Sequence, residues 1–73
     1  MGQYFEITGH NNMTVETGPK EIQRNLYAKD NRICFFNGMV IGEFATPERA
    51  AEVWKDLKQA ALDGEESFTL PQV

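Results

Sequence analysis

Residues 35–40 read Phe-Phe-Asn-Gly-Met-Val, which places an Asn-Gly pair between two short apolar runs. Asn and Gly tolerate the positive φ angles of a two-residue type I′ turn, so this pattern predicts a β-hairpin. The turn type also sets the register of the two strands, with Phe36 opposite Met39. We therefore expect antiparallel strands over about residues 32–37 and 39–45.

The same register places Arg32 opposite Glu43, and the opposite charges support the pairing. Upstream, residues 29–32 read as a second tight turn, which adds a strand over about residues 21–29 and pairs Tyr27 with Cys34. One face of this meander is expected to carry Leu26, Ala28, Ile33, Phe35, Val40 and Phe44. The other face is expected to carry Tyr27, Cys34, Phe36, Met39 and Ile41, with Arg32 and Glu43 at its margin.

A helix is predicted over about residues 47–62. Thr46 is a favourable N-cap, and Pro47 suits the first helical position because its missing N–H would have no partner there. Apolar residues recur at the spacing of one helical face, and Gly64 supplies a left-handed residue after the last turn. The members of this apolar stripe are Ala50, Val53, Trp54, Leu57 and Ala61.

Alternating apolar residues also predict strands over about residues 3–8 and 13–16, and a short last strand over residues 67–70. The fold class expected is α+β, with an antiparallel β-meander of about five strands followed by one amphipathic helix. The 73 residues are expected to form a single small domain. A chain of this length buries only about 60% of the surface that it exposes when unfolded, so its core is thin.

Both faces of the predicted meander are apolar, whereas one helix covers only one of them. The second face must be covered by the amino-terminal strands, by another copy of the protein or by a ligand. We expect a homo-oligomer, with a dimer as the first expectation. The residues predicted to lie in its interface are Tyr27, Cys34, Phe36, Met39 and Ile41.

Neither His10 nor Cys34, the only residues of their types, is predicted to be catalytic. His10 lies in a Gly/Asn-rich turn and is expected to be an exposed loop residue. Cys34 is expected to be a buried, inert thiol, because apolar surroundings raise the pKa of a cysteine. A single Cys cannot form a thiolate zinc site within one chain. The sequence therefore predicts no enzyme, no metal site and no cofactor.

A cluster of basic residues is the best candidate for ligand binding. Four of the seven Lys and Arg residues lie between positions 20 and 32, close to an aromatic side chain. In a symmetric oligomer they could hold an anionic small molecule at a subunit boundary, with Arg contacting phosphate oxygens and Tyr stacking. The alternative is that they are solvated strand ends. The residues concerned are Lys20, Arg24, Tyr27, Lys29 and Arg32.

The net charge of −4 opposes direct binding to nucleic acid, which depends on Lys and Arg displacing counterions. The start of the chain has neither the basic region nor the apolar stretch of a signal peptide, and no run of residues is long and apolar enough to span a membrane. We therefore expect a cytoplasmic location without membrane contact.

The segment over residues 32–71 combines an apolar strand, a Gly-Glu-aromatic step into a capped helix, and a closing aromatic residue followed by Pro. These features lie in the stretches Ile33-Cys34-Phe35-Phe36, then Ile41-Gly42-Glu43-Phe44-Ala45-Thr46-Pro47-Glu48-Arg49-Ala50-Ala51-Glu52-Val53, and Phe68-Thr69-Leu70-Pro71. With these stretches the segment resembles a group of short uncharacterised proteins of phages and prophages, mainly from Gram-positive bacteria. The resemblance implies the product of a mobile-element gene and no catalytic residues.

Two functions are expected from these observations. The first is a non-enzymatic accessory protein of a phage or mobile element that acts by binding, as a homo-oligomer, to a host protein. The alternative is sequestration of an anionic small molecule, such as a defence-signalling nucleotide, at subunit interfaces.

Overall fold

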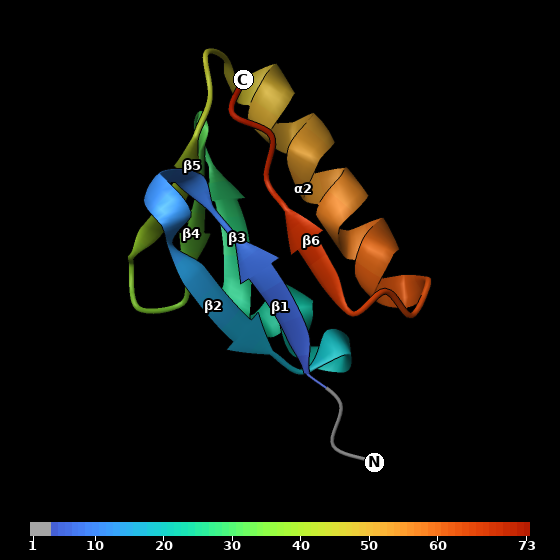
Figure 1. Ribbon diagram of the computed structural model, residues 1–73. Helices are drawn as coiled ribbons and strands as arrows, with labels where there is room; N and C mark the ends of the chain where they lie inside the picture. The colour runs from blue at the N-terminus through green and yellow to red at the C-terminus, as the bar shows by residue number, and fades with distance from the viewer. Residues whose placement is uncertain (1–3) are drawn as a thin grey trace.

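The computed structural model describes residues 4–73, which form an α+β fold of two small sheets and one long carboxyl-terminal helix (Figure 1). Sheet 1 has the strand order β2-β1-β6 and sheet 2 the order β3-β4-β5. In Figure 1 sheet 1 lies in front of sheet 2, and the helix α2 runs beside β6. The α+β class predicted from the sequence is confirmed, whereas a single five-strand meander is not found.

Sheet 1 joins strands from the two ends of the chain. Strands β1 (Phe5–Thr8) and β2 (Thr14–Thr17) are antiparallel, and β6 (Ser67–Thr69) lies parallel to β1 on its other side. A 3-10 turn, η1 (His10–Asn12), connects β1 to β2. The predicted strands thus exist with small shifts, and Gln3, with which the first was expected to begin, lies outside the described residues.

Sheet 2 is an antiparallel meander of β3 (Leu26–Lys29), β4 (Arg32–Phe35) and β5 (Val40–Glu43). The strand predicted over residues 21–29 is wrong in its first half, where η2 (Pro19–Glu21) and α1 (Ile22–Asn25) form helical turns. The fixed φ of proline suits the start of such a turn. Buried Ile22 anchors the segment to the core. These turns separate β2 from β3 and divide the strands into two sheets.

Helix α2 (Pro47–Leu62) has the predicted bounds. The hydroxyl oxygen of Thr46 accepts a hydrogen bond of 3.1 Å from the backbone N–H of Arg49, and Gly64 adopts a φ of 82° after the last turn. Trp54 is only half-buried at the margin of the core, where the Lys58 ammonium lies 5.1 Å from its ring centroid. The helix buries a stripe of Ala50, Val53, Leu57 and Ala61.

The hydrophobic core lies between the two sheets and α2, which packs against β3, β4 and β6. Sheet 1 supplies alternate residues of β1 and β2, and sheet 2 supplies the inner residues of its three strands. The members buried in this cluster are Phe5, Ile7, Val15, Ile22, Leu26, Ile33, Ile41, Phe44, Ala50, Val53, Leu57, Ala61 and Leu70. The amino-terminal hairpin therefore covers the inner face of sheet 2 together with the helix.

The β4–β5 hairpin differs from the predicted two-residue turn. The N–H of Gly38 donates to the carbonyl of Phe35 (2.8 Å), and the N–H of Phe35 donates to the carbonyl of Met39 (2.8 Å), which makes a three-residue loop. Gly38 carries the positive φ of 89° that closes it. Phe36 is therefore a loop residue, and the predicted pair of Phe36 with Met39 is wrong.

A bulge in β5 restores the predicted register at the far end of the same hairpin. Cys34 pairs with Val40, Ile33 pairs with Gly42, and Ile41 is the extra residue between them. The predicted pair of Cys34 with Ile41 is therefore wrong, whereas the pair of Arg32 with Glu43 is confirmed.

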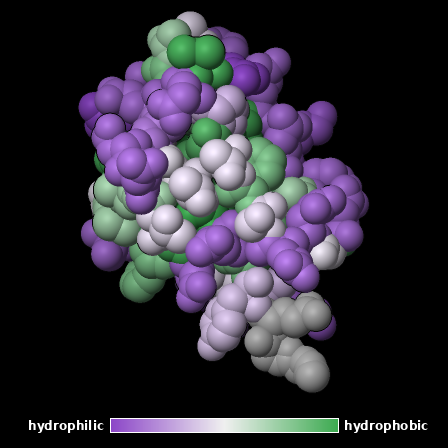
Figure 2. All heavy atoms as spheres, in the orientation of Figure 1, coloured by the Kyte–Doolittle hydropathy of each residue, from purple (hydrophilic) through white to green (hydrophobic). Residues whose placement is uncertain are grey.

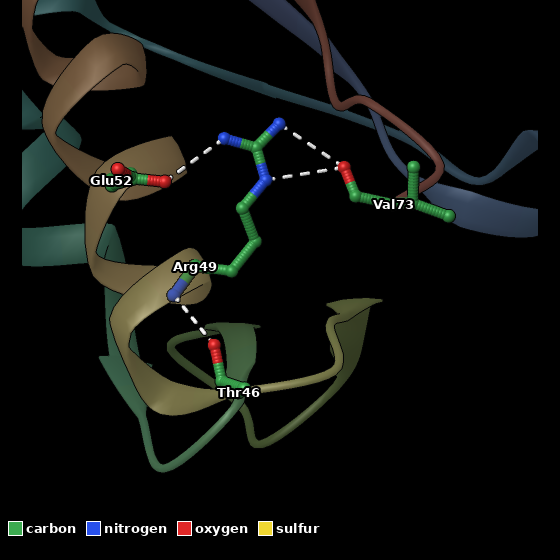
Figure 3. Close-up of polar contacts among 4 residues, drawn as sticks. All are labelled: Thr46, Arg49, Glu52 and Val73. Atoms are coloured by element: carbon green, nitrogen blue, oxygen red, sulfur yellow. Dashed lines mark hydrogen bonds and ion pairs between the residues drawn. The ribbon is translucent and has the colours of Figure 1, made fainter.

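Three contacts hold the segment that follows β6. The N–H of Leu70 donates to the carbonyl of Thr8 (2.8 Å), and Nε2 of His10 lies 2.7 Å from the carbonyl oxygen of Pro71. Figure 3 shows the third contact, in which the Arg49 guanidinium donates to the carbonyl oxygen of Val73 from Nε (3.2 Å) and Nη2 (3.1 Å) while Nη1 reaches Glu52. The end of the described chain is thus tied to η1 and to the start of α2.

Replacing Thr46 by Ala is expected to lower the free energy of unfolding by about 1 kcal/mol, because the N–H of Arg49 loses its capping acceptor. Chemical denaturation monitored by circular dichroism measures this change. Thr46→Ser keeps the hydroxyl and serves as the matched control, which should retain most of the stability. Equal losses in both variants would show that the cap is not the cause.

Candidate functional site

The most conspicuous surface of the described chain is the side of sheet 2 that faces away from the core. Alternation along β3 and β4 turns Leu26 and Ile33 inward, and it turns Tyr27 and Cys34 outward. We call this surface the outer face of sheet 2. Its members are Tyr27, Lys29, Arg32, Cys34, Val40 and Glu43, together with Phe36 at the adjoining hairpin loop.

Strand register arranges the outer face in two rows. The first row is charged and crosses the sheet from Lys29 through Arg32 to Glu43. The second row is apolar and crosses it from Tyr27 through Cys34 to Val40. Phe36 lies beyond the apolar row, with its ring centroid 4.8 Å from that of Phe35.

Large apolar side chains on this face are open to solvent. The exposed fraction is 40% for Tyr27, 39% for Val40 and 64% for Phe36. Figure 2 views the molecule from the side of sheet 1, where pale and green residues lie in the middle of the view and hydrophilic (purple) residues lie mainly around them. An apolar cluster left uncovered on a chain of this size is typical of a contact surface.

Two residues predicted for the interface lie elsewhere. The β5 bulge turns Ile41 into the core, where its exposed fraction is 1%, and Met39 packs against the same core. Val40, which the sequence analysis placed on the inner face, stands on the outer face instead. Tyr27, Cys34 and Phe36 are found on the outer face or at its edge.

Cys34 and Tyr27 are neighbours across β3 and β4. Cys34 is buried between its strand neighbours, as expected for a structural thiol. Partial burial raises the pKa of the Tyr27 hydroxyl above its ordinary value of 10.0, and the adjacent Cys34 thiol raises it further. Tyr27 therefore presents a neutral hydroxyl to solvent at neutral pH.

The five residues predicted to bind an anion are only partly brought together. Tyr27, Lys29 and Arg32 share the outer face, where Arg32 Nε lies 3.6 Å from Glu43 Oε2 and both side chains are more than half exposed. Lys20 belongs to η2 and Arg24 to α1, so both precede β3 and lie outside the two rows. Glu43 also neutralises part of the positive charge that an anion requires.

His10 is not the free loop residue that the sequence suggested. Its Nδ1 accepts a hydrogen bond of 3.1 Å from the backbone N–H of Glu43, which leaves Nε2 as the protonated nitrogen that donates to the carbonyl of Pro71. Its ring also packs edge-on against Phe44, with centroids 5.1 Å apart. His10 thus links η1, β5 and the carboxyl-terminal segment. Nothing in the local sequence signals this role, because the three partners are distant along the chain.

Within residues 4–73, no group of three or more His, Cys, Asp or Glu side chains is placed to hold a metal ion. Over the same residues, no helix has the length and apolar character needed to cross a bilayer. Comparison of the chain with protein-family models, with curated proteins and with solved structures found no match.

Proposed function

We propose that this protein is a non-enzymatic accessory protein that acts by binding a host protein, and that its acting form is a homo-oligomer assembled through the outer face of sheet 2. The observation that carries this proposal is the exposure of Tyr27, Val40 and Phe36 on one face. Burying such side chains between protein surfaces is favourable by about 25 cal/mol for each Å² of apolar area removed from water.

The residues best suited to catalysis are used structurally, which supports a binding role. Both ring nitrogens of His10 take part in hydrogen bonds that hold the fold. Cys34 is buried in the apolar row between Tyr27 and Val40, where it takes part in the packing of sheet 2. The resemblance of residues 32–71 to short phage and prophage proteins supports a mobile-element origin and, with it, a host protein as the target.

Affinity capture from a lysate of a Gram-positive bacterium tests the host-binding part of this proposal. The tagged wild-type protein is expected to retain a specific protein, and Phe36→Asp is expected to reduce its recovery at least tenfold. Leu62→Asp is the matched control, because Leu62 is an apolar residue with an exposed fraction of 79% that lies outside the outer face. Capture that is absent, or that is weakened equally by both substitutions, would contradict the proposal.

A second candidate function is supported by the shared position of Tyr27, Lys29 and Arg32 on the outer face. In an oligomer these side chains would be duplicated at a subunit boundary and could sequester an anionic nucleotide. A nucleotide present at about 100 times its dissociation constant should stabilise the protein by about 2.7 kcal/mol in a thermal-shift screen. Arg32→Gln should abolish that response, whereas Lys20→Gln should preserve it. A panel of cyclic and linear nucleotides without effect would exclude this candidate.

A further inference from the structure

Sheet 2 together with its β3–β4 turn carries no net charge, although the whole protein carries a net charge of −4. Sheet 2 and its β3–β4 turn contain two basic residues, Lys29 and Arg32, and two acidic residues, Asp30 and Glu43. All of the excess negative charge therefore lies outside this sheet. Two copies that approach through the rest of the surface meet its net negative charge, whereas sheet 2 adds no net charge to this repulsion.

The charged row also has opposite signs at its two ends. Lys29 lies on the edge strand β3, Glu43 lies on the opposite edge strand β5, and Arg32 stands between them on the central strand β4. Rotation by 180° about an axis along β4 exchanges the two edges. Such a rotation places Lys29 of one copy against the partner's Glu43 twice, once at each edge.

The apolar row obeys the same symmetry. The rotation places Tyr27 of one copy against the partner's Val40, and it places Cys34 against its own equivalent on the axis. The two Arg32 side chains also come near the axis, where each keeps its own Glu43 at 3.6 Å as a counter-charge. A surface that matches itself in this way is what a two-fold dimer requires.

We infer that the outer face of sheet 2 binds a second copy of this chain about a two-fold axis parallel to β4, with Lys29 of each copy paired to Glu43 of the other. This inference rests on the proposed function, whose homo-oligomer it specifies. The two sheets then stack face to face with aligned strands at about 10 Å, a common arrangement of packed sheets.

The size of the molecule agrees with such a dimer. A stable interface takes about 800 Å² from each partner. The accessible surface of the chain is 4892 Å². An interface of about 800 Å² would bury about one sixth of this surface.

Charge exchange tests the pairing. Sedimentation equilibrium at about 0.1 M salt, where exposed charges further apart than about 10 Å are screened, is measured for the wild type, Lys29→Glu and Glu43→Lys. The wild type is expected to be a dimer of twice 8.3 kDa. Each variant alone is expected to dissociate at least about tenfold more readily, because like charges then face each other at both edges.

An equimolar mixture of the two variants is expected to recover the dimer, because both edges then regain opposite charges. A purely structural defect would not be rescued by mixing. Lys20→Glu is the matched control, since it alters the net charge by the same amount as Lys29→Glu but lies on η2, outside the outer face. It should leave the dimer intact.

The outcomes separate this inference from the broader proposal. A wild-type oligomer that is insensitive to both substitutions, or a mixture that stays dissociated, would overturn the two-fold pairing and leave the homo-oligomer standing. A wild-type monomer at several hundred micromolar would overturn both. Loss of host-protein capture by Phe36→Asp in a protein that is always monomeric would show that the host protein, and not a second copy, occupies the outer face.

Discussion

Leu57→Ala is expected to lower the free energy of unfolding by about 3 kcal/mol, within the range of about 2–5 kcal/mol for large-to-small substitutions in a core. Leu57 is fully buried in the stripe by which α2 contacts the two sheets. The loss reflects packing, because Ala favours the helical conformation at least as much as Leu does. A domain of 73 residues has a total stability of about 4–11 kcal/mol, so this one side chain accounts for a large share.

Denaturant titration of the wild type and of Leu57→Ala measures the loss. Leu62→Ala is the control, since it makes the same chemical change in the same helix at a position with an exposed fraction of 79%. Its effect should stay below about 0.5 kcal/mol. Comparable effects at both positions would contradict the placement of the buried stripe.

Gly9→Ala is expected to destabilise the protein by about 3 kcal/mol or to prevent folding at 37 °C. Gly9 is buried against β5, and a β-carbon at this position would overlap the backbone carbonyl of Ile41. A backbone atom within a sheet cannot move aside as the end of a side chain can, so η1 would have to shift away from β5. That shift would also strain the hydrogen bond from the N–H of Glu43 to His10.

The matched control for this substitution is Gly18→Ala. A β-carbon at Gly18 would lie 3.3 Å from the carboxylate oxygen of Glu21, which is an exposed side chain that can rotate away. Both glycines have negative φ angles, −92° for Gly9 and −68° for Gly18, so backbone strain does not distinguish them. Thermal unfolding should show a large loss for Gly9→Ala and a small change for Gly18→Ala. A wild-type melting temperature for Gly9→Ala would refute the close contact of η1 with β5.

Local signals in the sequence were sufficient to predict the helix. The residues that mark the two ends of the helix, Thr46, Pro47 and Gly64, each act within one helical turn. The structure has the helix over Pro47–Leu62 as expected. The tight turn between Lys29 and Arg32 was predictable for the same reason. Signals that act over a few residues depend little on the rest of the fold.

The division into two sheets was not predictable from local patterns. Residues 21–25 alternate weakly in polarity, which suits a strand as well as a short helical turn, and the contact of Ile22 with the distant core decides between them. The parallel pairing of β6 with β1 also joins residues from opposite ends of the chain. Such pairings depend on tertiary packing and produce no periodic pattern of residues in the sequence.

The candidate site shows where the alternation of side chains along a strand predicts correctly which face each residue lies on, and where it does not. Alternation correctly separated Tyr27 and Cys34 from Leu26 and Ile33, because β3 and β4 are regular. It failed in β5, where one bulged residue exchanged the faces of Val40 and Ile41. A bulge inserts a single residue into the alternation, so every position between it and the loop changes side.

The pairing of β1 with β6 has a consequence for the order of folding. The two strands are neighbours in space, and His10 contacts Pro71 across 61 positions of sequence, whereas sheet 2 is assembled from residues that follow one another closely. Contacts between distant positions carry a larger entropic cost of loop closure and form later. During synthesis, β1 and β2 leave the ribosome before sheet 2 does, and sheet 1 is therefore expected to be completed only after Thr69 has emerged and β6 can pair with β1.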